Sequence, residues 1–203
     1  MPLMFATVIL AAGASSRMGR PKMLLPWGAT TVLGHLIAQW QQVGAAQIAV
    51  VCSAGDQGIN DELDRISFTR GLRILNPEPA RGMFSSIQCA ARWPGWNPAL
   101  THWAVTLGDQ PHLALDTLRA VAAFSASQPD KICQPSRNSR PRHPVFFPRP
   151  AFEALANSTQ ATLKEFLVAH ISEVRLMEVN DPGLDFDLDT PADYDRARRH
   201  MAL

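Results

Sequence analysis

The chain opens with a mostly apolar segment that runs directly into a loop of small residues. Residues 5–10 are rich in β-branched and apolar side chains, which predicts a buried first strand. Residues 11–19 include two glycines and two serines, and the cations Arg17 and Lys22 accompany them. Small residues let a backbone approach a ligand closely, and free N–H groups beside two cations suit a polyphosphate. The start of the chain therefore predicts a strand followed by a phosphate-binding loop.

This loop matches neither of the two familiar glycine-rich nucleotide fingerprints. Gly13 and Gly19 lack the intermediate glycine of G-x-G-x-x-G, and they lie one residue too far apart for G-x-x-x-x-G-K-[ST]. Lys22 also follows the second glycine by three residues rather than one. An ordinary strand-to-helix turn with solvent-facing basic residues would carry the same glycines, so the glycines alone leave both interpretations open.

The longer string from Leu10 to Lys22, L-A-A-G-x-S-x-R-M-G-x-x-K, resembles the signature of the MobA-like NTP transferase family. Members of this family join an NTP to a phosphorylated acceptor and release pyrophosphate. With Leu-Leu-Pro following, the string is most similar to the branch of molybdenum cofactor cytidylyltransferases. The resemblance implies a nucleotide-binding segment that contains Leu10, Ala11, Ala12, Gly13, Arg17 and Lys22. It also implies that the two cations, Arg17 and Lys22, are catalytic because they neutralise the triphosphate.

Ala12 bears on the choice of nucleotide. The cytidylyl branch carries L-A-A-G and the guanylyl branch L-A-G-G, so this chain resembles the former. A Cβ atom at this position narrows the base pocket and favours a pyrimidine. We therefore expect CTP as the nucleotide, with other NTPs as alternatives.

An aspartate ends another apolar strand, in the run Leu-Gly-Asp-Gln-Pro at 107–111. Open α/β sheets bind ligands at the carboxyl ends of their strands, and Asp109 would point into that crevice. A turn aspartate that caps the following helix would look the same. The resemblance identifies Asp109 as a catalytic, nucleotide-binding residue and a ligand of Mg²⁺, because the aspartate of the family's G-D-x-P motif binds magnesium. His102 and His112 flank the motif, and either is a candidate for the crevice.

A second carboxylate is expected because Mg²⁺ in such sites takes one or two carboxylates together with substrate phosphates. Asp185, Asp187 and Asp189 alternate along the chain, and in an extended conformation they would share one face. The family's D-x-D-T-P-x-D motif favours Asp189 as the second metal ligand and leaves Asp187 as the other choice. Thr190, followed by proline and Asp193, predicts a helix start.

A further nucleotide segment follows from the resemblance. The family's pattern of an asparagine, a glycine six residues later and a serine four residues after that matches Asn76, Gly82 and Ser86. We expect these residues at the base or ribose. A Gly/Ser-rich helix start would account for the serines as well.

The acceptor region departs from the family pattern. Relatives carry G-H-P where this chain has Arg142, His143 and Pro144. His143 and Arg142 are candidate acceptor-binding residues, since an arginine suits a phosphate, but a solvated basic loop explains them equally. Residues 157–164 also lack the glycines and arginine that relatives carry there. The acceptor therefore stays open: a molybdopterin-type compound is expected, with a sugar phosphate as the alternative.

Apolar runs and amphipathic stretches alternate along the chain, which predicts βαβ units and a mostly parallel sheet. We expect an α/β protein with a three-layer αβα Rossmann-like nucleotidyltransferase fold and a mostly parallel, mixed sheet. Residues 1–203 are expected to form one domain, with an N-terminal nucleotide-binding part and an acceptor-binding part at roughly 135–185. Predicted strands cover 5–10, 47–52, 72–75, 103–107, 131–134, 145–147 and 174–179; predicted helices cover 31–43, 57–66, 82–92, 115–125, 151–156 and 162–169, with a terminal helix after 190.

Composition excludes several other classes. Nineteen basic residues against 18 acidic ones give a net charge of +1, without the concentrated basic surface that nucleic acid requires. Three widely spaced cysteines form no C-x-x-C pair, which favours a reducing cytoplasm over a disulfide framework or zinc site. No segment predicts a membrane span. A molybdoenzyme or its chaperone is a possible partner by the resemblance, and a non-catalytic carrier of cofactor or nucleotide is the alternative to an enzyme.

Overall fold

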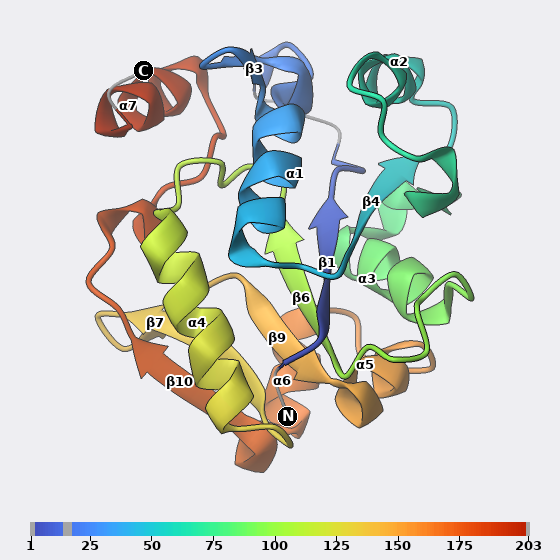
Figure 1. Cartoon of the computed structure of the whole chain (residues 1–203), viewed down its shortest axis with the longest axis vertical. Coiled ribbons are helices and arrows are strands. Elements are labelled where there is room, and N and C mark those ends of the chain that lie inside the picture. The colour runs from blue at the N-terminus through green and yellow to red at the C-terminus, as the bar shows by residue number, and fades with distance from the viewer. Residues whose placement is uncertain (1–2, 14–17, 202–203) are drawn as a thin grey trace.

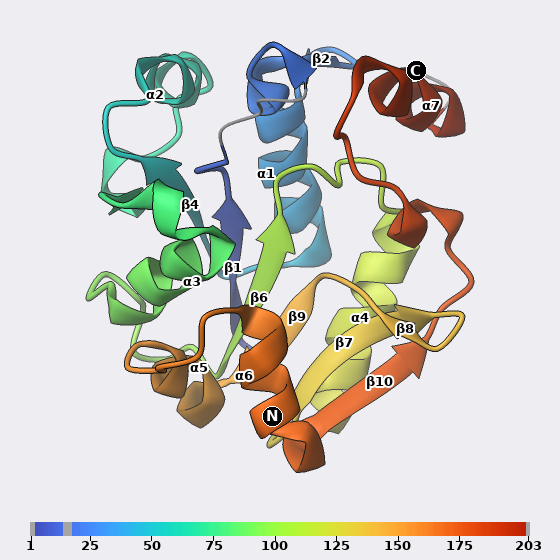
Figure 2. The same ribbon diagram turned by 180° about the vertical axis from the view of Figure 1, so that it is seen from behind.

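The computed structural model of the protein describes residues 3–13 and 18–201. Its centre is a mixed sheet in the order β10-β7-β9-β6-β1-β4-β5, with β8 paired to β7. Helices cover both faces, so the predicted three-layer α/β architecture is confirmed (Figures 1 and 2). The strands are β1 (Phe5–Leu10), β4 (Gln47–Ser53), β5 (Arg73–Asn76), β6 (His102–Leu107), β7 (Ile132–Arg137), β8 (Arg140–Pro141), β9 (Val145–Pro148) and β10 (Val174–Glu178).

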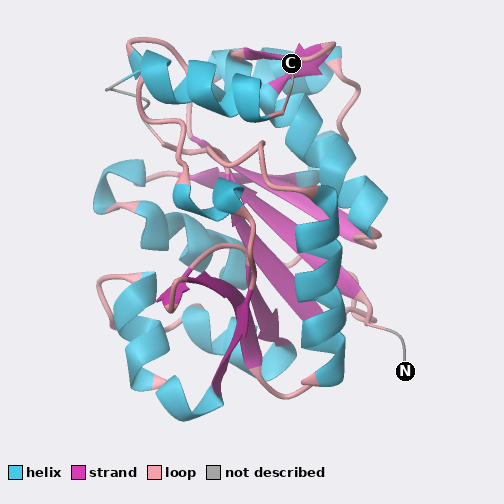
Figure 3. Ribbon diagram, turned by 90° about the vertical axis from the view of Figure 1, so that its left-hand side faces the viewer, coloured by secondary structure: helices cyan, strands magenta, loops and turns pink. Residues whose placement is uncertain are grey.

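The two helical layers bury separate apolar clusters against the sheet. In β1, Phe5 and Ile9 belong to one cluster while Ala6, Val8 and Leu10 belong to the other, as the alternation of side chains along a strand requires. Figure 3 shows the sheet edge-on between these layers. The first layer contains α1 (Val32–Val43), α2 (Gln57–Arg65), α4 (Leu115–Ser127) and α7 (Pro191–His200); the second contains α3 (Met83–Arg92), α5 (Arg149–Leu155) and α6 (Leu163–Ala169).

The strand order places a ligand crevice at one end of the sheet. β1 pairs in parallel with β4 on one side and with β6 on the other. The chain proceeds from β1 outward through β4 to β5 and then returns to β6, so the order reverses between β1 and β6. Ligands of open α/β sheets bind at such a switch point, beyond the carboxyl ends of the strands. In Figure 1 both strands point toward the end of the molecule where β3 and α7 lie.

β9 makes the sheet mixed. It lies between β6 and β7 and runs antiparallel to both, whereas β10 runs parallel to β7. This insertion brings residues that precede β9 beside the carboxyl end of β6, next to the switch point.

Short elements complete the fold and are absent from the predicted set. The hairpin of β2 (Pro26–Trp27) and β3 (Thr30–Thr31) precedes α1, and five short 3₁₀ helices are present within the described residues. These are η2 (Lys22–Leu24), η3 (Arg70–Leu72), η4 (Pro79–Arg81), η5 (Ile171–Glu173) and η6 (Pro182–Asp185). The predicted longer elements all occur, and their ends agree with the structure to within three residues. In the part of the chain that the structure describes, no helix is long and apolar enough to cross a bilayer.

Candidate active site

Lys22 joins two aspartates from distant parts of the sequence. Its Nζ donates to Oδ2 of Asp109 at 3.1 Å and to Oδ1 of Asp189 at 2.9 Å. Lys22 begins η2, Asp109 follows β6, and Asp189 lies between η6 and α7. The three side chains retain 16 to 28% exposure, so they remain open to a ligand. The structure thus brings together three residues that the sequence assigns to one site.

Asp109 and Asp189 stabilise the charged form of Lys22. Partial burial disfavours the ammonium form, but the hydrogen bonds and charges of Asp189 and Asp109 outweigh burial and raise the pKa of Lys22. The ammonium group therefore stays protonated at neutral pH and is available to neutralise anionic phosphates.

A cleft of about 550 Å³ opens beside this cluster at the carboxyl ends of β1 and β6. Eight of the predicted nucleotide-binding residues line it: Leu10, Ala11, Ala12, Gly13, Lys22, Gly82, Ser86 and Asp109. Ser53, Met83 and Leu107 also line it and are absent from the predicted set. Ser53 ends β4, next to β1, so the strand-end rule that indicates Asp109 could also have indicated this serine. Arg17 lies outside the described residues.

Hydrogen bonds and close packing hold the loop after β1 against the ends of β4 and β6. The Ser53 hydroxyl donates to the carbonyl of Ala12 at 3.0 Å, and the Ala11 N–H donates to the carbonyl of Val51 at 2.9 Å. Gly108 lies so close to β1 that a Cβ atom there would stand 2.6 Å from the carbonyl oxygen of Leu10. Only glycine permits this approach, which sets the position of Asp109 next to the loop after β1.

Asn76 supports the cleft from behind and does not line it. Its amide donates to the hydroxyls of Ser85 and Ser86 at 2.8 and 2.9 Å, and its Oδ1 accepts the N–H of Glu78 at 2.9 Å. The residue is 1% exposed. Asn76 thereby fixes the start of α3, which follows Gly82 at a φ of +90°. Ser86 faces the cleft, whereas the side chain of Asn76 is engaged within the protein.

The acidic segment near the C-terminus divides into two parts. Asp187 accepts a hydrogen bond from Gln110 Nε2 at 3.0 Å; burial, followed by the charge of Asp109, raises the pKa of Asp187. Asp185 instead pairs with Arg142 and Arg137. The expectation that three alternating aspartates share one face is therefore wrong for Asp185, because η6 turns the chain before the extended segment begins.

Neither predicted acceptor residue lines the cleft: His143 lies near Asp109, whereas Arg142 pairs with Asp185. Nδ1 of His143 is buried and has no hydrogen-bond partner within the described residues. Burial lowers the pKa of His143, although the carbonyl of Val105 and the charge of Asp109 oppose this shift, so the ring is neutral near pH 7. Arg142 is bound to Asp185 by two nitrogens, at 3.2 and 2.6 Å.

The two histidines that flank the aspartate motif lie elsewhere. His102 begins β6, at the opposite end of the strand from Asp109. His112 is fully buried, and its Nε2 lies 3.0 and 3.1 Å from the carbonyl oxygens of Gly183 and Phe186. Neither histidine therefore lines the cleft: His102 lies at the far end of β6, and His112 packs against the segment at residues 183–186.

The family follows from comparison with known proteins. The model of the MobA-like NTP transferase domain matches residues 7–174. The chain belongs to this family. The match spans the glycine loop and Asp109 and ends before the segment that carries Asp187 and Asp189.

Relatives of this MobA-like NTP transferase include two kinds of molybdenum cofactor enzyme. It is 29% identical to the molybdenum cofactor cytidylyltransferase of Escherichia coli (strain K12), over 94% of each chain. It is also 29% identical to the molybdenum cofactor guanylyltransferase of Rhizobium johnstonii, over 97% of this chain and 92% of the relative. Its fold matches the crystal structure of Rv0371c from Mycobacterium tuberculosis, with a TM-score of 0.75 and 28% identity over 97% and 98% of the two chains.

The MobA-like site contains two carboxylates that converge on one point. Among the described residues, no group of three or more His, Cys, Asp or Glu side chains could hold a metal ion by itself. Asp109 and Asp189 nevertheless place carboxylate oxygens within 3.1 Å of one cation, the Lys22 ammonium. Two carboxylates that converge in this way fit a magnesium ion whose remaining ligands come from phosphates and water.

Proposed function

We propose that this protein transfers CMP from CTP to a phosphorylated molybdopterin-type acceptor and releases pyrophosphate. The observation that carries the proposal is the convergence of Lys22, Asp109 and Asp189 beside the cleft that the loop after β1 lines. Triphosphate, metal and acceptor each need charge neutralisation at one place, and this cluster supplies both signs of charge there.

The chemistry needs positioning more than proton transfer. An acceptor phosphate oxygen attacks the α-phosphorus in line, the bond between the α-phosphorus and its bridging oxygen to the β-phosphate breaks, and pyrophosphate leaves. The attacking oxygen is anionic near neutral pH, so no strong general base is required. Lys22, together with Arg17, would neutralise the β- and γ-phosphates and the departing pyrophosphate.

Asp109 and Asp189 would hold Mg²⁺, with Asp187 beside them. When bound, the metal supplies neutralisation of the phosphate charge. A structure of Rv0371c in complex with manganese, with a TM-score of 0.70 and 28% identity to this chain, supports a divalent metal in a protein of this kind.

CTP is the proposed nucleotide because Ala12 lines the cleft and carries a Cβ atom where the guanylyl branch has glycine. Overall identity does not discriminate, since the cytidylyltransferase and guanylyltransferase relatives are both 29% identical to this chain. The base is therefore assigned on the geometry of the loop after β1.

We assign the acceptor to the region next to Asp109 and Asp185, where His143 and Arg142 lie. The buried Nδ1 of His143 can donate to or accept from a pterin, and an arginine donates to its phosphate. A molybdoenzyme or its chaperone would receive the product. The three cysteines are free thiols, which agrees with a cytoplasmic reaction.

Pyrophosphate release tests the proposal, assayed with each NTP, Mg²⁺ and molybdopterin. CTP with molybdopterin is expected to turn over fastest. Faster turnover with GTP would overturn the base assignment, and turnover only with a sugar phosphate would overturn the acceptor assignment. Tight cofactor binding without turnover of any pair would identify a carrier instead of an enzyme.

A further inference from the structure

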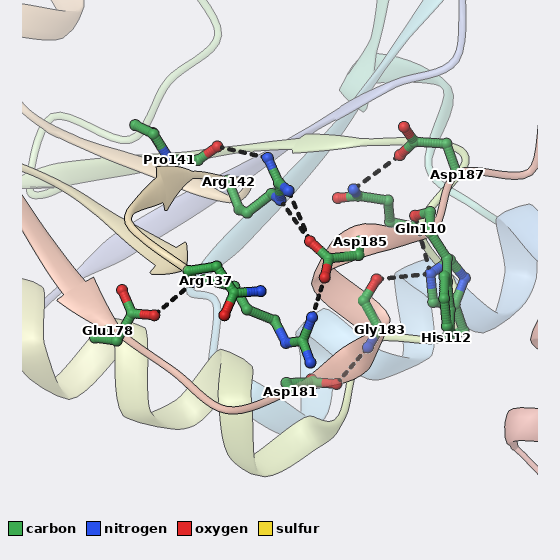
Figure 4. Close-up of polar contacts among 12 residues, drawn as sticks. Gln110, His112, Arg137, Pro141, Arg142, Glu178, Asp181, Gly183, Asp185 and Asp187 are labelled. Carbon is green, nitrogen blue, oxygen red and sulfur yellow. Dashed lines mark hydrogen bonds and ion pairs between the residues drawn. The ribbon is translucent and has the colours of Figure 1, made fainter.

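A row of hydrogen bonds joins residues 109–114, which follow β6, to the acidic segment at residues 181–189. The backbone N–H of Leu188 donates to the carbonyl of Asp109 at 3.1 Å. Next along the chain, the Gln110 amide donates to Asp187 (Figure 4). Two consecutive residues after β6, Asp109 and Gln110, thereby bind two consecutive residues of the acidic segment.

The backbone of the acidic segment is fixed by other groups. His112 Nε2 lies between the carbonyls of Gly183 and Phe186, and since both are acceptors this nitrogen carries the proton. Asp181 accepts hydrogen bonds from the N–H of Ala114 at 3.2 Å and the hydroxyl of Thr117 at 2.8 Å. These contacts hold the path of η6 but leave the rotamer of the Asp187 side chain to Gln110.

Gln110 is an unusual residue to bury for packing alone. It is 4% exposed, and its Oε1 is buried with no hydrogen-bond partner among the described residues. A buried acceptor without a hydrogen-bond partner destabilises the fold, and a methionine or leucine of similar volume would avoid this cost. The amide lies where its one described hydrogen bond goes to the Asp187 carboxylate.

We propose that Gln110 is a positioning residue that orients the carboxylate of Asp187 toward the metal site. The hydrogen bond to Oδ1 selects one rotamer of Asp187 and leaves Oδ2 for a cation or a metal-bound water. Outer partners that orient metal-binding side chains in this way typically change metal affinity or activity by 10- to 100-fold when they are removed. The inference rests on the proposed metal-dependent transfer, in which Asp187 stands beside Asp109 and Asp189.

The affinity of the protein for Mn²⁺ tests the inference directly. It is measured in the presence of a non-hydrolysable CTP analogue, from the electron paramagnetic resonance signal of the Mn²⁺ that stays free. We expect Gln110→Met to weaken Mn²⁺ binding by about 10-fold. The matched control is Gln88→Met: Gln88 is also buried, at 5% exposure, but it donates to the carbonyl of Ser158, away from the acidic segment. The control is expected to bind Mn²⁺ as the wild type does.

A double-mutant cycle separates positioning from a general loss of structure. If Gln110 acts through Asp187, then Gln110→Met adds no further weakening in an Asp187→Asn background. Additive losses, or wild-type Mn²⁺ affinity in Gln110→Met, would overturn the inference. If Gln110→Met fails to fold, Gln110→Asn replaces it, because its shorter amide cannot reach Asp187, and the same loss is expected. A wild type that binds Mn²⁺ but turns over no NTP would contradict the proposed function and leave this comparison intact.

Discussion

At the scale of single residues, the site depends on one lysine between two aspartates. The ammonium of Lys22 contacts both carboxylates, yet all three side chains retain contact with solvent. Partly exposed ion pairs contribute little to folding, about 1 kcal/mol or less, because water replaces the lost partner. Catalysis by charge neutralisation depends far more on the same cation, so the two roles can be separated by substitution.

Lys22→Met is therefore expected to lower kcat by about 100-fold or more while the protein still folds. The thermal unfolding midpoint should fall by no more than about 4 °C, which corresponds to roughly 1 kcal/mol in a chain of this size. Steady-state pyrophosphate release and thermal unfolding monitored by circular dichroism measure the two effects. Lys131→Met, at a partly exposed lysine that ends a helix–strand connection, is the control for both. A kcat within a few-fold of the wild-type value would contradict the role of Lys22.

At the scale of elements, a close approach between two strands sets the geometry of the site. Gly108 stands against the carbonyl of Leu10 and the sulfur of Met23, each 2.6 Å from where a Cβ atom would lie. Backbone cannot move aside as a flexible side chain can, so an added methyl group must push the end of β6 away from β1. Asp109 is the next residue and would move with it.

Gly108→Ala is expected to destabilise the protein by about 1–3 kcal/mol through overpacking and to lower turnover as well. Urea unfolding and pyrophosphate release measure these effects. Gly71→Ala is the matched control, because a Cβ atom at Gly71 meets nothing within 4 Å, and its stability and turnover should equal those of the wild type. A fully active Gly108→Ala protein would show that the approach of β6 to β1 does not set the position of Asp109.

A second contact joins α1 to α2, and both helices pack against η2, which carries Lys22. The Thr31 hydroxyl, at the N-terminus of α1, donates to Glu62 of α2 at 2.6 Å, and Arg65 pairs with the same carboxylate. Hydrogen bonding to Arg65 and Thr31 outweighs burial and lowers the pKa of Glu62. A lowered pKa in the folded state means that the charged carboxylate stabilises the fold above the unfolded pKa, and that this contribution is lost as pH falls through the folded pKa.

Glu62→Gln is accordingly expected to reduce the free energy of unfolding at pH 7 by no more than about 1 kcal/mol, since Arg65 is mostly exposed. The difference from the wild type should shrink once the pH falls below about 4.5, the ordinary glutamate value. Urea unfolding at pH 7, 5 and 4 tests this dependence. Glu153→Gln removes a carboxylate with 61% exposure and should change little at any of these values. A difference that grows toward pH 4 would contradict the assignment.

The elements show how far sequence patterns reach. Apolar runs predict the strands β1, β4 and β6 because each is buried on both faces, and the family motifs indicate the residues at their ends. The antiparallel insertion of β9 could not be read from its sequence, because the neighbours of a strand depend on tertiary pairing. The pairing of Asp185 with Arg137 and Arg142 could not be predicted from the sequence either. It depends on the direction of η6, which is fixed by hydrogen bonds to Asp181 and His112.

At the scale of the whole molecule, the two parts expected from the sequence share their cores. β9, from the part at 135–185, pairs with β6 of the nucleotide-binding part. Phe146 enters the apolar cluster on one face of the sheet together with Trp40, and Phe147 enters the cluster on the other face together with Val105. The Lys22–Asp189 contact also joins residues 167 positions apart. Neither part can lose its packing without exposing apolar surface of the other.

We therefore expect the protein to unfold in one cooperative transition, as a single domain does. Far-ultraviolet circular dichroism and tryptophan fluorescence should give the same urea midpoint. Addition of CTP with Mg²⁺ should shift both midpoints together, because a ligand that binds only the folded state stabilises every part that unfolds with its site. Two separate transitions, with the ligand raising only one of them, would instead show that residues 135–185 form an independent unit. In that case the pairing of β9 with β6 would be too weak to make the two parts unfold together.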